Sequence, residues 1–148
     1  MENNEIKIIT DGITRIGYLY EKWAKEHNIN SYIMDILYAI KIMGITKQKE
    51  IVENYGMPKQ TVNTAITELQ RKEYIKLIQD ENDKRSKIIE LTPEGENYAD
   101  LILSPLVDCE KRVLGLIEKE NIDIWIKTMN QYADLFEKEM KRYKSGGF

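Results

Sequence analysis

The chain has 148 residues, of which 42% are hydrophobic and 32% are charged, and its formal net charge at pH 7 is −3. This composition is that of a globular protein with one core, and it excludes a disordered or fibrous chain. No apolar run approaches the roughly 20 residues that span a bilayer, so we expect no membrane contact. The acidic, polar start and the single cysteine predict a cytoplasmic protein.

The first predicted element is a long N-terminal helix. Its apolar side chains recur at alternating spacings of three and four residues, at Ile6, Ile9, Ile13, Ile16, Tyr20 and Trp23. Such a narrow stripe is typical of a helix that packs against another helix rather than against a broad core. We therefore predict that residues 1–30 form an N-terminal dimerisation arm.

Three shorter helices are predicted next. Ser31 is expected to cap a helix that ends at Gly44, and Thr46 to cap a helix that ends at Gly56. Pro58 suits the first turn of the following helix, because the N–H that proline lacks would be unpaired there. This helix has a buried stripe, with Val62, Ala65, Ile66 and Leu69, and a polar face, with Gln60, Asn63, Thr64, Thr67 and Arg71.

A charged hairpin follows that helix, with predicted strands over 74–79 and 87–91. Asn82 and Asp83 favour a turn, and the tip places three cations within four residues, Lys84, Arg85 and Lys87. An isolated hairpin of this kind is usually only a solvated turn. Its position after a helix with a polar face favours instead a wing that contacts DNA. The stretch from Lys47 to Lys87 has nine Lys/Arg and seven Asp/Glu, a net charge of +2, which permits this interpretation.

Two further helices complete the predicted order. Thr92 is expected to cap the first, with Pro93 in its first turn and Pro105 as the point of a kink. Its apolar stripe contains Cys109, which we predict to be a buried structural thiol rather than a redox sensor. The last helix has a stripe that includes Ile126, Met129, Phe136 and Met140. We predict C-terminal dimerisation helices over 97–144 and a flexible tail over 145–148.

The polar face of the fourth helix has the chemistry of a DNA-reading surface. Gln60 and Asn63 can pair with adenine edges, and Thr61 or Thr64 with a phosphate or a thymine methyl. Lys59 can meet a phosphate without selecting a base. The alternative is an ordinary amphipathic helix with a solvated face, although Glu/Lys pairs would be more typical of such a face.

Three motifs together resemble the MarR family of transcriptional regulators. They are Ile45–Ile51, Met57–Asn63 and Asp80–Arg85, the last followed by the Leu-Thr-Pro-Glu-Gly of 91–95. The resemblance covers 31–96, the predicted DNA-binding lobe, and the arms match in pattern only. It implies a mainly α winged helix-turn-helix with a small antiparallel β-wing and N- and C-terminal helical dimerisation arms. The chain departs from the family at Glu73, where a glycine is usual. If the backbone is left-handed there, a non-glycine residue costs about 1 kcal/mol.

The resemblance also implies a function, a homodimeric repressor that binds a pseudo-palindromic operator in double-stranded DNA and is released by a small effector. Arg85 would reach the minor groove, with Asp83 as the brace of the wing. The predicted DNA-binding residues are Lys59, Gln60, Thr61, Asn63, Thr64, Lys84, Arg85 and Lys87. The predicted dimer interface is formed by Ile6, Ile9, Ile13, Ile16, Ile126, Met129, Phe136 and Met140, and the alternative is that these stripes pack within one chain.

An effector pocket is predicted where the N-terminal arm approaches the lobe. Its residues would be Tyr18, Trp23, Tyr32 and Tyr38, with a small aromatic or amphipathic ligand, and the alternative is that these aromatic side chains simply pack in the core.

Other functions find little support in the sequence. With His27 and Cys109 as the only histidine and cysteine, we expect no metal site, no cofactor and no nucleophile–base pair, and hence no enzyme. The alternative function is a winged-helix protein-interaction module that does not bind DNA.

Overall fold

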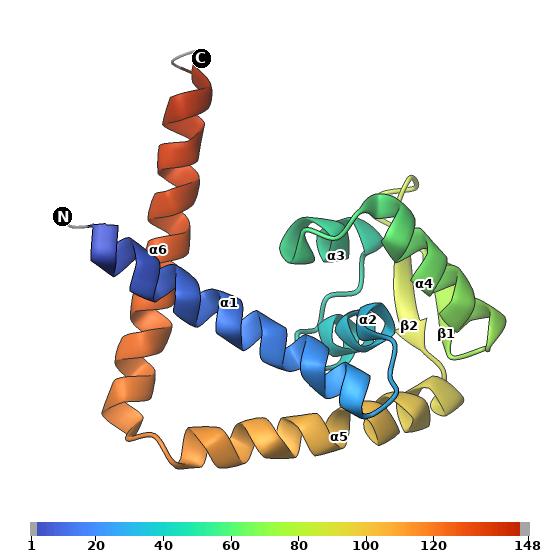
Figure 1. The fold of residues 1–148 in the computed structure, drawn as a ribbon. Helices are drawn as coiled ribbons and strands as arrows, with labels where there is room; N and C mark the ends of the chain where they lie inside the picture. Colours follow the sequence, from blue (N-terminus) through green and yellow to red (C-terminus); the bar gives the residue numbers. More distant parts are fainter. Residues whose placement is uncertain (1–2, 146–148) are drawn as a thin grey trace. The chain divides into compact units, whose positions relative to one another are not determined.

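A computed structural model describes residues 3–145 of the chain, and these residues form six helices and one two-stranded sheet (Figure 1). The elements are α1 (Asn3–Glu26), α2 (Ser31–Lys41), α3 (Gln48–Tyr55), α4 (Lys59–Arg71), β1 (Ile75–Gln79), β2 (Lys87–Leu91), α5 (Pro93–Gly115) and α6 (Lys119–Ser145). Contacts divide the chain into two units, Met1–Leu106 and Val107–Phe148. The predicted fold class, mainly α with a small antiparallel wing, is confirmed.

The core of the first unit lies between α2, α3, α4 and the hairpin. Apolar side chains from each element are 0–1% exposed there, among them Ile36, Leu37, Ile51, Val62, Leu69 and Ile89. The predicted stripe of α4 is buried in full, because its 4-3 spacing places these side chains on one face of the helix. The opposite face of α4 is thereby left to solvent.

Two of the predicted helix starts are shifted. The cap of α2 is Asn30 and not Ser31, since the Asn30 amide oxygen accepts hydrogen bonds from the N–H groups of Tyr32 and Ile33, at 3.0 and 3.2 Å. Pro58 is the residue before α4 and not the first residue of the helix. The Pro58 carbonyl still accepts the N–H of Val62 at 3.1 Å, which is the first hydrogen bond of the helix. The proline ring fixes the φ of the residue that makes this bond.

Thr46 does not cap α3, contrary to the prediction. The residue before the helix is Lys47, which is extended and makes no side-chain cap. The Thr46 carbonyl instead accepts the N–H of Ile89 at 2.7 Å, and Lys47 forms an isolated bridge with Ile88. Thr46 and Lys47 are therefore held as an extended segment beside β2. Thr46 lies one residue too early to cap the helix, because α3 begins after Lys47.

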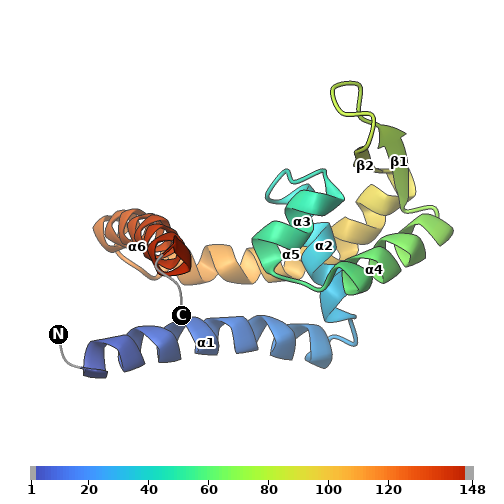
Figure 2. The ribbon, with the colours of Figure 1, turned by 90° about the horizontal axis from the view of Figure 1, so that it is seen from above.

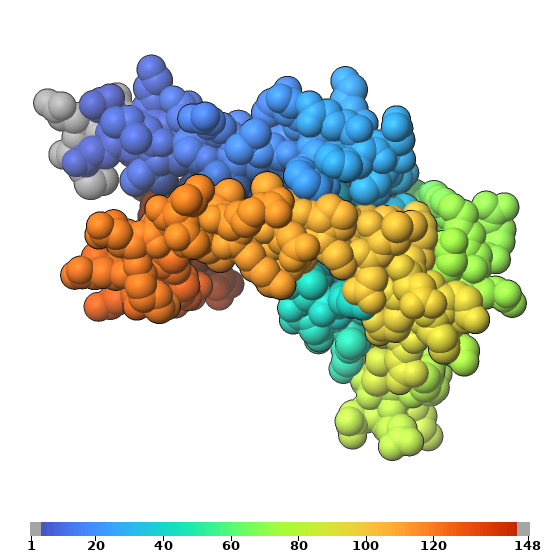
Figure 3. All heavy atoms as spheres, turned by 90° about the horizontal axis from the view of Figure 1, so that it is seen from below, coloured from blue at the N-terminus to red at the C-terminus, as the bar shows by residue number. Residues whose placement is uncertain are grey.

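The two strands of the wing pair in antiparallel register, from Ile75 opposite Leu91 to Gln79 opposite Lys87. They project beyond the helices of the first unit in the ribbon and space-filling views (Figures 2 and 3). Glu73, just before β1, has a φ of 58°, so the left-handed conformation considered for this position is present. Gly44 and Gly56 are also left-handed, at 69° and 61°, as their predicted roles at helix ends require.

Thr92 caps α5 as predicted, because its hydroxyl oxygen accepts the N–H of Gly95 at 3.0 Å. The same hydroxyl donates to the Glu73 carbonyl at 2.7 Å. Helix α5 continues through Pro105, and its buried side chains end at Leu106. Cys109 is half-buried, whereas a buried structural thiol was predicted from its apolar stripe.

Helix α6 in the second unit begins at Lys119, and its side chains are almost all exposed. The predicted tail, 145–148, lies outside the described residues except for the backbone of Ser145. The division of the chain into functional segments at residues 30 and 96 stays a prediction.

Candidate nucleic-acid interface

Helix α4 presents the predicted polar residues on its outer surface. Lys59, Gln60 and Thr64 are exposed, and Thr61 and Asn63 are half-buried. The buried stripe on the other face fixes the rotation of the helix about its axis, so these five side chains cannot turn inward.

The threonine hydroxyl protons on α4 are already used. Thr64 donates to the Gln60 carbonyl at 2.9 Å, and Thr67 donates to the Asn63 carbonyl at 2.8 Å. Such bonds to the preceding turn leave the hydroxyl oxygen and the methyl group for other contacts. Thr64 is therefore suited to accept a hydrogen bond or to touch a thymine methyl.

Asn63 has a partner that the sequence analysis did not find. The side-chain amide of Gln48, the first residue of α3, donates to the Oδ1 of Asn63. A bidentate contact with adenine needs both the oxygen and the NH₂ group of asparagine, so Gln48 competes for half of that contact. No sequence pattern relates these residues, because they meet only through the packing of α3 against α4.

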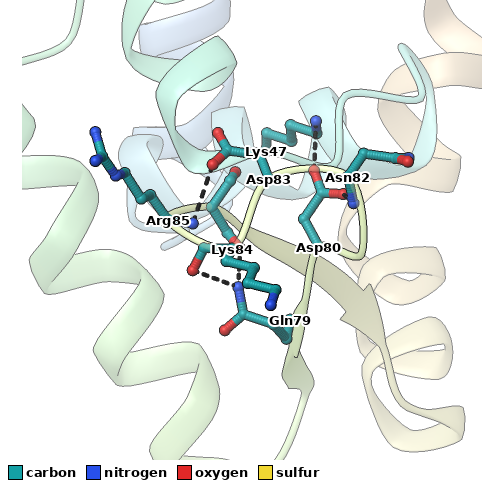
Figure 4. Close-up of polar contacts among 8 residues, drawn as sticks. Lys47, Gln79, Asp80, Asn82, Asp83, Lys84 and Arg85 are labelled. Atoms are coloured by element: carbon teal, nitrogen blue, oxygen red, sulfur yellow. Dashed lines mark hydrogen bonds and ion pairs between the residues drawn. The ribbon is translucent and has the colours of Figure 1, made fainter.

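The tip of the wing is a turn held by its own backbone and side chains (Figure 4). The Asp83 carboxylate accepts the backbone N–H of Arg85 at 3.0 Å, and the Asp83 carbonyl accepts the N–H of Ser86 at 2.8 Å. Gln79 donates to the carbonyls of Lys84 and Ser86 at 2.7 and 3.0 Å. Asp83 thus supports Arg85 through the backbone, and the guanidinium extends away from the turn (Figure 4).

Four cations surround this surface without an anionic partner. Lys59, Lys84, Arg85 and Lys87 are exposed, and none forms an ion pair with another residue of the described chain. An exposed cation that is not neutralised within its own protein is available for a phosphate group.

The structure brings half of the predicted DNA-binding residues into one groove. A cavity of about 550 Å³ lies between α3, α4 and the wing, and Lys59, Asn63, Arg85 and Lys87 line it together with Gln48 and Lys49. Gln60, Thr61 and Thr64 line a separate depression of about 260 Å³ beside Asn30 and Tyr32. Lys84 lines neither. The predicted set therefore spans two adjoining sides of α4 rather than one patch.

A second cavity, of about 340 Å³, lies between α1, α2 and the end of α3. Tyr32 and Tyr38 of the predicted effector pocket line it, and Tyr18 and Trp23 do not. Tyr18 is 60% exposed, and Trp23 stacks on His27 with ring centroids 4.2 Å apart. Tyr20, an aromatic residue of the same predicted junction, also lines the cavity. The ionisable lining residues Glu21, Asp35 and Tyr55 were not predicted from the sequence.

Burial shifts the pKa of two groups in this second cavity, Asp35 and Tyr55. Burial raises the pKa of Asp35 to about 6, and the nearby Glu21 carboxylate adds to the rise. Burial also raises the pKa of Tyr55 to about 12, with a further contribution from Asp35. Negative charge is therefore unfavourable in this cavity.

The predicted dimer-interface side chains lie on the surface of their own units. On α1, Ile6, Ile9, Ile13 and Ile16 are 44–58% exposed, and on α6, Ile126, Met129, Phe136 and Met140 are 48–57% exposed. On each of these helices the exposed apolar side chains form a continuous face, whereas an ordinary protein surface exposes apolar residues singly.

Metal sites and membrane-spanning helices are both absent from the described residues. No group of three or more His, Cys, Asp or Glu side chains is arranged to hold a metal ion there. The described helices include none that combines the length and the apolar character needed to cross a membrane.

Part of the chain is similar to a known protein family. Residues 34–86 match the model of the MarR family. A MarR family regulator from Neisseria meningitidis has the same fold with a TM-score of 0.80 and 22% identity, over 96% of this chain and 99% of that chain. No curated protein matches the sequence.

Two further solved structures share the fold at low identity. MarR from Staphylococcus aureus, in complex with salicylate and kanamycin, has a TM-score of 0.67 and 24% identity, over 93% of this chain and 95% of that chain. The regulator BldR from Sulfolobus solfataricus has a TM-score of 0.69 and 18% identity, over 90% and 98%. At these identities the likeness concerns the fold.

Proposed function

We propose that the chain is a MarR-family winged helix-turn-helix transcriptional regulator and that it acts as a homodimeric repressor of a pseudo-palindromic operator. Members of this family are not enzymes, and the proposal involves no chemical reaction of the protein. The two copies of α4 would enter successive major grooves, about 34 Å apart, and the two wings would lie against the flanking phosphates and minor grooves.

The observation that carries the proposal is the set of unneutralised cations around α4 and the wing. Lys59, Arg85 and Lys87 line one groove, and no carboxylate of the described chain pairs with any of them. Because the chain as a whole has a net charge of −3, a cationic groove is not a consequence of composition. It supports contact with the DNA backbone.

Base selection is assigned to the polar side chains of α4. Gln60, Thr61 and Thr64 lie toward one side of the helix, and Asn63 faces the groove with Gln48 beside it. Gln60 is exposed and has room for a bidentate contact with adenine. Asn63 would contribute mainly its NH₂ group, which suits an acceptor on the base edge.

Release by a small molecule is the second part of the proposal. The Staphylococcus aureus protein binds salicylate and kanamycin, and the present chain has a cavity of about 340 Å³ between α1, α2 and α3. A ligand with higher affinity for one spacing of the two α4 helices would shift the dimer toward that spacing.

The proposal is tested by selecting the preferred site from a genomic DNA library and measuring its affinity by fluorescence anisotropy across a salt series. We expect the selected duplex to bind at least about 10³-fold more tightly than a scrambled duplex. Arg85→Ala should weaken binding and reduce the salt slope by about 2 for a dimer, without unfolding the domain.

Lys76→Ala is the matched control, because Lys76 is an exposed cation of the same hairpin but lines neither groove of α4. Affinity for the selected site no greater than for random DNA would refute the proposal. That result would favour the alternative, a winged-helix module that binds another protein.

A further inference from the structure

The cavity between α1, α2 and α3 is walled by aromatic side chains. Tyr20 of α1, Tyr32 and Tyr38 of α2, and Tyr55 at the end of α3 line it, with Met34 beside them. Its volume of about 340 Å³ is at the lower end of the range for small-molecule sites, which suits a ligand of one ring and a short substituent.

The charged groups of this cavity are all of one sign. Glu21 and Asp35 are its only lining residues with a formal charge, and no Lys, Arg or His lines it. Neither carboxylate forms an ion pair with another described residue. A ligand anion would meet two like charges here, whereas a cation would meet two opposite charges.

Tyrosine rings and carboxylates favour the same kind of ligand. The face of an aromatic ring attracts a cation within about 6 Å of its centre, and a desolvated position strengthens this attraction. Four rings around two carboxylates are therefore complementary to a positively charged group that carries apolar substituents.

We propose that this cavity binds a small organic cation, either a hydrophobic amine or a quaternary ammonium compound, with Asp35 and Glu21 as counter-ions and the tyrosines as the walls. The proposal rests on the proposed function only where it makes this cation the effector; the site itself is independent of DNA binding.

The Asp35 carboxylate gives the cavity an energetic cost that such a ligand would remove. Burial and the nearby Glu21 hold the pKa of Asp35 at about 6, so its ionised form is disfavoured. A bound cation would stabilise that form and lower the pKa again. A cation would therefore gain binding free energy from the partly buried Asp35 carboxylate, whereas a neutral or anionic ligand would not, and the cavity would select for positive charge.

The test is isothermal titration calorimetry on the full chain with three ligands of similar size, benzyltrimethylammonium, benzyl alcohol and salicylate. We expect benzyltrimethylammonium to bind at least about tenfold more tightly than benzyl alcohol, because of the two carboxylates and the ring faces. Salicylate should bind most weakly. Tighter binding of salicylate or of benzyl alcohol than of the cation would overturn the proposal.

Variants locate the binding to this cavity. Asp35→Asn and Glu21→Gln should each weaken binding of the cation by about threefold to tenfold and leave benzyl alcohol nearly unchanged. Glu26→Gln is the control, since Glu26 is an exposed carboxylate of the same helix as Glu21 that does not line the cavity. Equal cation affinity in all three variants would place the ligand elsewhere and overturn the proposal.

The effector role is measured separately on the selected operator. Weaker operator binding in the presence of benzyltrimethylammonium, with Asp35→Asn requiring a higher concentration for the same effect, supports the cation as effector, and unchanged operator binding overturns that role. If the chain binds no operator at all, the regulator proposal fails, while the calorimetry still decides the cation site.

Discussion

The ammonium nitrogen of Lys47 lies 2.6 Å from the Oδ2 of Asp80, and this ion pair joins the start of α3 to the point where the wing leaves β1 (Figure 4). The Asp80 side chain is only 3% exposed, and its other oxygen accepts the N–H of Asn82 at 2.9 Å. Lys47 holds the pKa of this carboxyl below its ordinary value, with the Asn82 hydrogen bond as a second cause. The pair therefore fixes the orientation of the wing relative to the helix-turn-helix.

Replacing Lys47 by methionine should destabilise the protein at neutral pH, because it leaves a buried carboxylate without its partner. The double variant Lys47→Met with Asp80→Asn should recover part of the loss, since both charges are then removed. Urea unfolding of the two single variants and the double variant measures this coupling. Strictly additive changes in the free energy of unfolding would mean that the pair does not act as a unit.

Gly95→Ala should destabilise the fold strongly. A Cβ at this position would lie 1.8 Å from the Tyr74 carbonyl oxygen and 2.7 Å from its carbon, both of them backbone atoms that cannot move aside. We expect a loss of about 2–4 kcal/mol in the free energy of unfolding, from overpacking at the junction of β1 and α5.

Gly115→Ala is the matched control for this substitution. It lies at the end of the same helix, and nothing lies within 4 Å of the Cβ that alanine would add. Its effect should stay within about 0.5 kcal/mol. A loss in Gly95→Ala no larger than that in Gly115→Ala would show that the close approach to Tyr74 does not decide the effect, because helix propensity alone favours alanine over glycine.

Glu73→Gly should stabilise the protein by about 0.5–1 kcal/mol. Glu73 has a φ of 58°, a left-handed conformation in which a Cβ is unfavourable and glycine is not. Gln70→Gly, three residues earlier and inside α4, should instead cost about 1 kcal/mol. Thermal unfolding of both variants checks the opposite signs, and destabilisation by Glu73→Gly would show that the glutamate side chain has a contact that outweighs the strain.

Local signals in the sequence predicted the order and type of the elements. The strand Lys87–Leu91 and the Thr92 cap were placed correctly because strand alternation and capping depend on neighbouring residues. The residues that precede α2 and α3, Asn30 and Lys47, were each missed by one position. At α2 two adjacent polar residues could serve as the cap, and at α3 the preceding segment pairs with β2 instead of capping the helix.

Contacts between distant segments could not be predicted. Gln48 meets Asn63, and Lys47 meets Asp80, only because α3 packs between α4 and the wing. The carboxylates Glu21 and Asp35 line one cavity because α1 packs against α2, and no spacing rule in the sequence relates residues of two different helices. The chemical character of individual residues could therefore be predicted from the sequence, whereas the residues that they contact could not.

Charged substitutions in the arms should dissociate the proposed dimer. Ile13→Asp on α1 and Ile126→Asp on α6 each introduce a carboxylate into an apolar face, at side chains that are 58% and 53% exposed in the single chain. Because those side chains already face solvent, the folded monomer should tolerate the change while an interface would not. Sedimentation velocity should show monomers.

Ile42→Asp is the control for the arm variants, since Ile42 is 45% exposed but lies just after α2, outside both arms. It should leave the oligomeric state unchanged. A dimer that persists in both arm variants would move the interface to another surface.

Asp35→Asn should make the protein more stable at pH 7.5 and have almost no effect below pH 4. Burial raises the folded pKa of Asp35 from 3.8 to about 6, with Glu21 of α1 as a second cause. The other titratable groups that line the same cavity are the phenols of Tyr20, Tyr32, Tyr38 and Tyr55. The folded state thus binds this proton more tightly than the unfolded chain does. Its contribution is fully present below pH 3.8 and is lost as the pH rises through 6.

The side-chain amide introduced by Asp35→Asn resembles the protonated carboxyl, so the gain in stability should grow across that same interval. We expect about 1–2 kcal/mol at pH 7.5, a value reduced for the partial solvent exposure of the group. Urea unfolding between about pH 3.5 and 8 measures the difference, with Glu26→Gln as the exposed-carboxylate control. A difference that does not change with pH would mean that Asp35 is not titrating in this interval, and that the cavity does not oppose its charge.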